Sequence, residues 1–173
     1  MMMRLVIVCM LAGCIMVGCD STKKAGQTED GENGRIVSPE YFAKQIFNYV
    51  VNAKDLDDMA YFPYAEIARK ISPKETEALS DEEIMEKLLV PQRDKLKQDV
   101  MNIRAQFEDV GQSTSDAQFT GFKEETEAKI GDISVMSIYF KSGDLKGTIP
   151  ITYNQSELGY YIFEILVSTR NLK

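Results

Sequence analysis

Apolar side chains in the first half of the chain recur every three or four residues, the period of a helix buried on one face. The clearest case begins at Ser38-Pro39, where a serine suited to capping a helix precedes a proline suited to its first turn. The apolar positions that follow predict an amphipathic helix over 39–53; they are Phe42, Ile46, Tyr49 or Val50, and Ala53.

Further helical segments are expected before residue 110. The stretch KDLDDMAYF predicts a short helical turn that ends near Phe62-Pro63, because proline disfavours helix at the residue before it. Ser80 stands three residues ahead of Glu83 in a capping-box pattern that opens the next helix. Pro91 either kinks that helix or begins another one. The helix beyond this proline carries one apolar stripe, formed by Leu96, Val100, Ile103 and Phe107.

After GQSTSD the period changes from helical to two, the period of a strand. ISVMSIYF (133–140) is apolar on both faces and predicts a central strand. A tight SGD turn leads to LKGTIPITY, a half-buried strand in which Pro150 indicates an edge or a bulge. YYIFEILVS predicts another strand, and residues 119–129 predict a weaker one ahead of all three. Helices followed by about four antiparallel strands make an α+β fold.

The first 18 residues differ from the rest of the chain. Arg4 is their only charge, and an unbroken run of apolar or small residues follows it from Leu5 to Gly18. This is the pattern of a cleaved signal peptide, and the run is short for a bilayer-spanning helix, which needs about 20 residues. A chain of 173 residues has room for one core, so we expect a single domain over 36–173.

All three cysteines lie at this end of the chain, and the region resembles the signals of bacterial lipoproteins, in which small residues precede a lipidated cysteine. LAGC, ending at Cys14, is nearer to that consensus but leaves an apolar core of about seven residues, the lower limit. MVGC, ending at Cys19, allows a longer core and is followed by the polar DSTKK. We expect the lipid at Cys19, with a flexible tether up to residue 35. An ordinary secretory signal is the alternative.

Composition then excludes several chemistries. The chain has no histidine, and cleavage before Cys19 leaves no second thiol, so imidazole catalysis, Cys-based zinc sites and a disulfide framework are excluded. Cleavage also removes Arg4 and leaves 19 basic against 27 acidic residues, a net charge of −8. Such a surface repels phosphate backbones, so we expect no nucleic-acid partner. We also expect no metal and no cofactor.

Two longer stretches resemble the nuclear transport factor two-like (cystatin-like) fold, in particular small bacterial lipoproteins with that domain. YVVNAKDLDDMAYF (49–62) is similar to the first helix, the Asp-containing break and the second helix of such proteins. FKSGDLKGTIPITYNQSELGYYIFEI (140–165) is similar to their hairpin and to the start of their last strand, although Tyr161 stands where they often have Trp. The resemblance implies a cone-shaped domain whose curved sheet wraps the first helix.

The resemblance also implies a ligand pocket at the open end of the cone, and a sheet face that often forms homodimers in this fold. The candidate lining residues are Tyr41, Tyr49, Tyr64, Tyr139, Tyr161 and Glu164. Glu164 interrupts an apolar run, and a buried lone carboxylate there would have a raised pKa and act as a base or an anchor. Strand alternation favours the other interpretation, in which Glu164 faces water and the tyrosines pack in the core and its rim.

Two functions are compatible with these patterns. We expect a non-enzymatic envelope lipoprotein, periplasmic or surface-facing, that holds a small apolar ligand or docks a partner protein at the membrane. The alternative is a small pocket enzyme in which a tyrosine and a carboxylate carry out acid–base chemistry. That alternative requires Glu164, Asp57 or Asp58 in a cavity, within hydrogen-bond reach of a tyrosine hydroxyl.

Overall fold

The computed structural model describes residues 37–130 and 133–167. The predicted signal peptide, Cys19 and the tether lie outside these residues. Helices come first and strands last, which confirms the α+β class. The helical elements are α1 (Pro39–Asn52), α2 (Ala65–Ile71), α3 (Pro73–Thr76), α4 (Asp81–Ile84), the π-helical turn η1 (Met85–Leu89), α5 (Val90–Asp109) and the 3₁₀ turn η2 (Thr114–Asp116). The strands are β1 (Ala117–Ile130), β2 (Ile133–Ser142), β3 (Leu145–Ser156) and β4 (Gly159–Ile165).

Helix α1 begins and ends close to the predicted residues. The hydroxyl of Ser38 accepts a hydrogen bond from the backbone N–H of Tyr41 (3.1 Å), and Pro39 occupies the first turn. Its buried face contains the predicted apolar positions Phe42, Ile46, Tyr49 and Val50, together with Ala43, Phe47 and Val51.

The helical turn predicted over 54–62 is wrong. The chain passes through bends there, and the next helix begins at Ala65. The cause is local, because the carboxylate of Asp55 accepts a hydrogen bond from the backbone N–H of Asp57 (2.8 Å), a turn that competes with helix. Pro63 also removes a backbone donor from the segment.

Pro91 does not divide the long helix. Elements α4, η1 and α5 follow one another directly, with the predicted capping box of Ser80 and Glu83 at the start. The backbone N–H of Val90 bonds to the carbonyl of Met85, five residues back, instead of four. This wider turn accommodates Pro91, which has no N–H to continue the ordinary ladder.

The four strands form one antiparallel sheet, which is not closed, in the order β1-β2-β3-β4. Strand β2 is interior, as predicted. Strand β3 is interior as well, so Pro150 does not mark an edge strand, although a register shift lies nearby between Thr152 and Tyr153. The proline is tolerated because β4 ends at Ile165, and the next residue, Leu166, donates to the carbonyl of Pro150 (2.8 Å).

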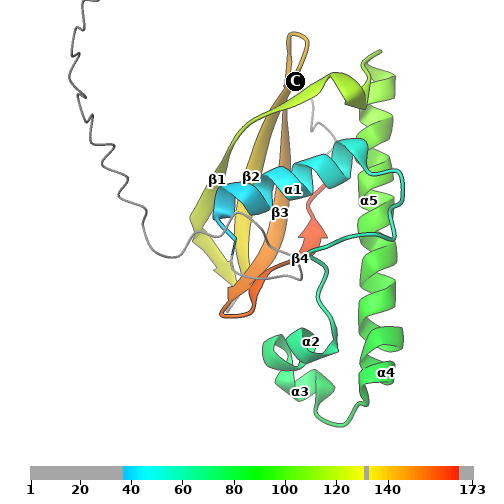
Figure 1. Ribbon diagram of the computed structural model, residues 1–173, viewed down its shortest axis with the longest axis vertical. Helices are drawn as coiled ribbons and strands as arrows, with labels where there is room; N and C mark the ends of the chain where they lie inside the picture. The colour runs from blue at the N-terminus through cyan, green and yellow to red at the C-terminus, as the bar shows by residue number, and fades with distance from the viewer. Residues whose placement is uncertain (1–36, 131–132, 168–173) are drawn as a thin grey trace, which may run out of the picture.

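Helix α1 lies across one face of the sheet, and α5 runs along the side of the molecule next to β4 (Figure 1). Aromatic rings fill the space between these helices and the sheet. Phe42 stacks on Tyr160 with 4.9 Å between ring centroids, and Phe107 stacks on Phe140 at 5.4 Å. The opposite face of the sheet carries partly exposed side chains, among them Tyr139.

Candidate functional site

A groove lies along the outer side of α1, between this helix and the connection that leads to α2. Its volume is about 280 Å³. One wall comes from α1 residues between Gln45 and Asn52 and from Ala53, and the other comes from Asp58 to Tyr61. The groove exists because residues 54–62 do not form a helix and instead fold back beside α1.

The second wall is attached to both the helix and the sheet. The backbone carbonyl of Tyr61 accepts a hydrogen bond from the N–H of Ile162 on β4 (2.9 Å). The ring of Tyr61 is buried and meets Phe42 of α1 edge to face, with 5.3 Å between centroids. These two contacts fix the position of the second wall relative to α1 and β4.

Tyr49 forms the end of the groove where α1 finishes. Its hydroxyl donates to the backbone carbonyl of Leu56 (2.6 Å), which fixes the connection against the helix. Burial raises the pKa of Tyr49, although the positive charges of Lys97 and Arg104 oppose that shift. The hydroxyl is therefore neutral at physiological pH and acts as a donor.

Arg104 of α5 binds the same end of α1. Its Nε donates to the carbonyl of Val50 (2.7 Å), and its Nη2 donates to the carbonyls of Tyr49 (3.0 Å) and Ala53 (2.9 Å). The carbonyl of Tyr49 also accepts from the backbone N–H of Ala53 (3.3 Å), whereas most carbonyls at the end of a helix lack a helical partner. A cation there also meets the negative end of the helix dipole. One arginine thus fixes the end of α1 on α5.

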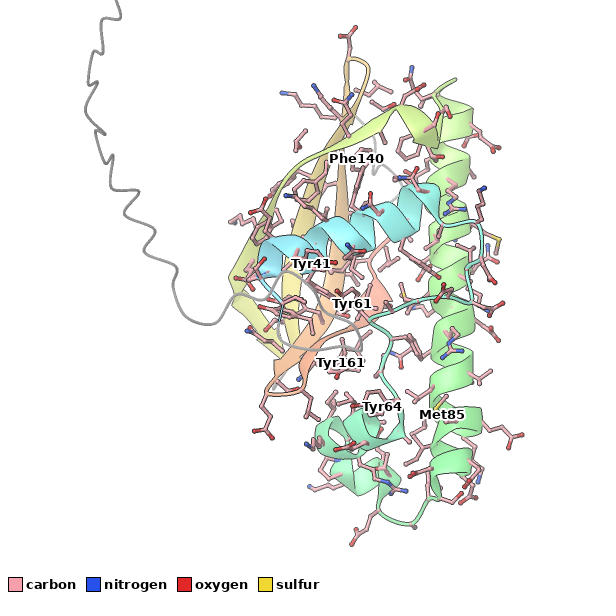
Figure 2. The ribbon with its side chains drawn as sticks, in the orientation of Figure 1. Tyr41, Tyr61, Tyr64, Met85, Phe140 and Tyr161 are labelled. Carbon is pink, nitrogen blue, oxygen red and sulfur yellow. The ribbon has the colours of Figure 1, made fainter. Side chains whose placement is uncertain are left out.

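Tyr49 is the only one of the six predicted residues that lines this groove. Tyr41 lies half-buried in the first turn of α1, close to Tyr61. Tyr64 and Tyr161 lie together, edge to face, with 6.0 Å between centroids. Figure 2 shows Tyr41, Tyr61, Tyr161 and Tyr64 following one another from α1 toward α2. Only Tyr64 and Tyr161 among these four described residues make a ring contact with each other, and none of the predicted residues in this row lines the groove.

The other predicted residues lie outside the groove. Tyr161 is buried and its hydroxyl donates to the carbonyl of Leu158 (2.8 Å). Tyr139 lies on the far face of the sheet. Glu164 forms an ion pair with Lys95 of α5, and its side chain is 39% exposed. The interpretation of Glu164 as a buried, lone carboxylate is therefore wrong.

Neither aspartate named for acid–base chemistry reaches a tyrosine hydroxyl among the described residues. Asp57 forms an ion pair with Lys97 of α5. Asp58 is exposed and lines the groove that Tyr49 closes.

The sequence patterns missed a tyrosine–carboxylate pair on the inner face of the sheet. The hydroxyl of Tyr153 donates to Oε1 of Glu124 at 2.5 Å. Burial and then the hydrogen bond to Glu124 raise the pKa of Tyr153, and burial with the nearby carboxylate raises the pKa of its stacked neighbour Tyr160 to about 12. Inward alternation in β3 places Tyr153 correctly, but Glu124 faces inward only because β1 has a bulge between Phe119 and Gly121.

Comparisons with known proteins identify no relative: no protein-family model, curated protein or solved structure matches the chain. Across residues 37–130 and 133–167, none of the helices has the length and apolar character needed to cross a membrane. The same described residues contain no cluster of three or more acidic, histidine or cysteine side chains that would hold a metal ion. Any function assigned to this chain therefore rests on its own residues.

Proposed function

We propose that this protein is a lipid-anchored lipoprotein of the bacterial envelope whose folded part is a non-enzymatic binding module. The signal pattern and Cys19 support the anchor, and the order of helices and strands supports a cone-shaped domain of the nuclear transport factor two-like kind. The groove beside α1 is the observation that carries the binding role. Its volume of about 280 Å³ is close to the lower end of the range of about 300–1,000 Å³ for ligand pockets.

The ligand site of this proposal is the outer side of α1 and not the interior of the cone. The interior is occupied by stacked rings, including Phe42, Phe140 and Tyr160. A ligand there would have to displace close-packed side chains, which is costly. The groove, in contrast, is concave without any rearrangement.

The Tyr153–Glu124 pair is the strongest argument for the enzyme alternative, and its surroundings favour the binding role. Tyr153 is 2% exposed, so a substrate has little access to its hydroxyl. Its raised pKa makes the hydroxyl a poor general acid as well as a poor general base at neutral pH, because either role needs a pKa near the working pH. The pair therefore serves as a part-buried hydrogen bond between β1 and β3.

Native mass spectrometry of the processed protein, gently extracted from the membranes in which it is expressed, tests this proposal. The denatured mass reports which cysteine begins the mature chain. We expect a native excess of a few hundred daltons from a bound small molecule. The variant Ala60→Trp fills the groove and should lose the excess, while Ala105→Trp, at an exposed position on α5, should retain it.

A native mass equal to that of the bare lipoprotein would contradict ligand binding at the groove. Whole multiples of that mass would instead point to self-association, for which the far face of the sheet with Tyr139 is the candidate surface.

A further inference from the structure

The outer side of α1 carries uncharged carboxamides at positions where surface helices often carry charge. Gln45, Asn48 and Asn52 are spaced by three and four residues, which places them on one face of the helix, and all three line the groove. Asn48 lies in the middle of α1, where asparagine is a poor helix former. A surface residue that weakens its own helix and forms no stabilising contact in return is expected to have a functional role, such as binding a ligand.

The hydrogen-bonding groups of these carboxamides are available to a ligand as far as the described residues are concerned. None of the three makes a side-chain hydrogen bond within the part of the chain that the structure describes. The carboxamides of Gln98 and Asn102, spaced by four residues on α5, do bond to each other at 3.0 Å. The α1 set has the same spacing between Asn48 and Asn52 and leaves its donors and acceptors directed to the groove and to solvent.

The chemistry of the groove matches a ligand with several hydroxyl groups. A carboxamide both donates and accepts, as a hydroxyl does, so a row of carboxamides satisfies neighbouring hydroxyls in either direction. Asp58 adds a carboxylate acceptor, and it is the only charged residue in the lining. Met59 and Ala60 supply an apolar surface beside these polar groups, and the buried Ile46 and Tyr61 lie behind it. Polar edges next to an apolar patch correspond to the hydroxyl groups and the C–H face of a sugar ring.

We propose that the groove binds one neutral sugar residue, whose hydroxyls bond to Gln45, Asn48, Asn52 and Asp58. Met59 and Ala60 contact the C–H face of the ring. A volume of about 280 Å³ suits a single ring better than a longer chain. This inference rests on the proposed function, since it names the ligand class of the same groove, and it replaces the expected small apolar ligand.

Saturation-transfer NMR on the processed, detergent-solubilised lipoprotein tests the inference, with glucose and N-acetylglucosamine as probes and benzyl alcohol as an apolar comparison. We expect saturable transfer to the ring protons of at least one sugar. Asn48→Ala and Asn52→Ala should each weaken that binding by about tenfold, the effect of losing a hydrogen bond that the ligand needs. Asn102→Ala removes a carboxamide from α5 that is not part of the groove lining, and it should leave the affinity unchanged.

Each outcome separates this inference from the proposed function. If neither sugar shows saturable transfer but benzyl alcohol does, and that transfer depends on the groove, the ligand is not a sugar and the groove remains a ligand site. Sugar transfer that Asn48→Ala and Asn52→Ala leave unchanged places the sugar elsewhere and also overturns the inference. No transfer to any probe, together with a bare native mass, contradicts both. Alanine favours helix at these positions, so circular dichroism should show that the variants fold.

Discussion

The ring of Phe140 on β2 lies directly over Gly147 on β3, its cross-strand partner. A β-carbon at position 147 would be 1.9 Å from Cζ of Phe140. The other side of that ring stacks on Phe107 of α5, so the ring has no room to move away. The contact between α5 and the sheet therefore depends on the absence of a side chain at Gly147.

Gly147→Ala should destabilise the domain by about 1–3 kcal/mol, the usual cost of forcing extra atoms into a packed core. Alanine in a strand would otherwise be stabilising relative to glycine, so the sign of the effect identifies the clash. Urea unfolding followed by circular dichroism measures the change in the free energy of unfolding. In a Phe140→Ala background the clash is absent, and the same substitution should be neutral or stabilising. Equal costs in both backgrounds would contradict this account.

Arg104→Ala should destabilise the domain by about 2–3 kcal/mol, because three backbone carbonyls at the end of α1 lose a charged donor. Arg104→Lys should recover only part of the loss, since an ammonium group cannot reproduce the fork of the guanidinium. Lys74→Ala on α3 is the control, and as an exposed substitution it should change stability by less than about 0.5 kcal/mol. Thermal or urea unfolding gives the stability of the three variants. An Arg104→Ala variant as stable as the control would contradict the role of Arg104 in capping α1.

The protein should lose stability as the pH rises from about 10 toward about 12. Burial raises the pKa of Tyr160 to about 12, whereas in the unfolded chain this hydroxyl ionises near pH 10. The folded chain then holds a proton that the unfolded chain has released, so the contribution of Tyr160 is complete below pH 10 and falls above it. Burial raises the pKa of Tyr153 in the same direction, with Glu124 contributing next. Urea unfolding at about pH 9 and about pH 11 measures the fall.

The variant Tyr160→Phe retains the ring and removes the ionisable hydroxyl, so it should make this alkaline fall shallower. Tyr139→Phe, at an exposed position, should leave the fall unchanged. A fall of the same steepness in all three proteins would show that the buried tyrosines are not its cause.

Cys19→Ala should remove the protein from the membrane fraction, because the diacylglyceryl acceptor is lost. Cys14→Ala should leave membrane partitioning and the lipidated denatured mass unchanged. A lipidated product that persists in Cys19→Ala and disappears in Cys14→Ala would show that the lipid is attached to Cys14. If neither substitution changes the mass or the location, the N-terminus is an ordinary secretory signal.

Several elements were predictable because their causes are local. Ser38-Pro39 begins α1, and Ser80 with Glu83 begins α4, since a cap depends on residues within one turn. The alternation around β2 and β3 placed Ile149, Ile151 and Tyr153 in the core for the same reason. The absence of helix over 54–62 was not recognised, because its cause is a side-chain to backbone hydrogen bond within the turn.

The candidate site was far less predictable from the pattern. The sequence by itself determined most of the helices and strands, although not α2 or α3, and for most of those predicted it determined which face is apolar. Only the tertiary structure decided that Glu124 faces inward, because a bulge in β1 reverses the alternation. It also decided that Glu164 pairs with Lys95 and that residues 58–61 lie beside Gln45 and Asn48. Periodicity describes one element at a time, whereas a groove depends on how two segments are placed against each other by contacts with α5 and β4.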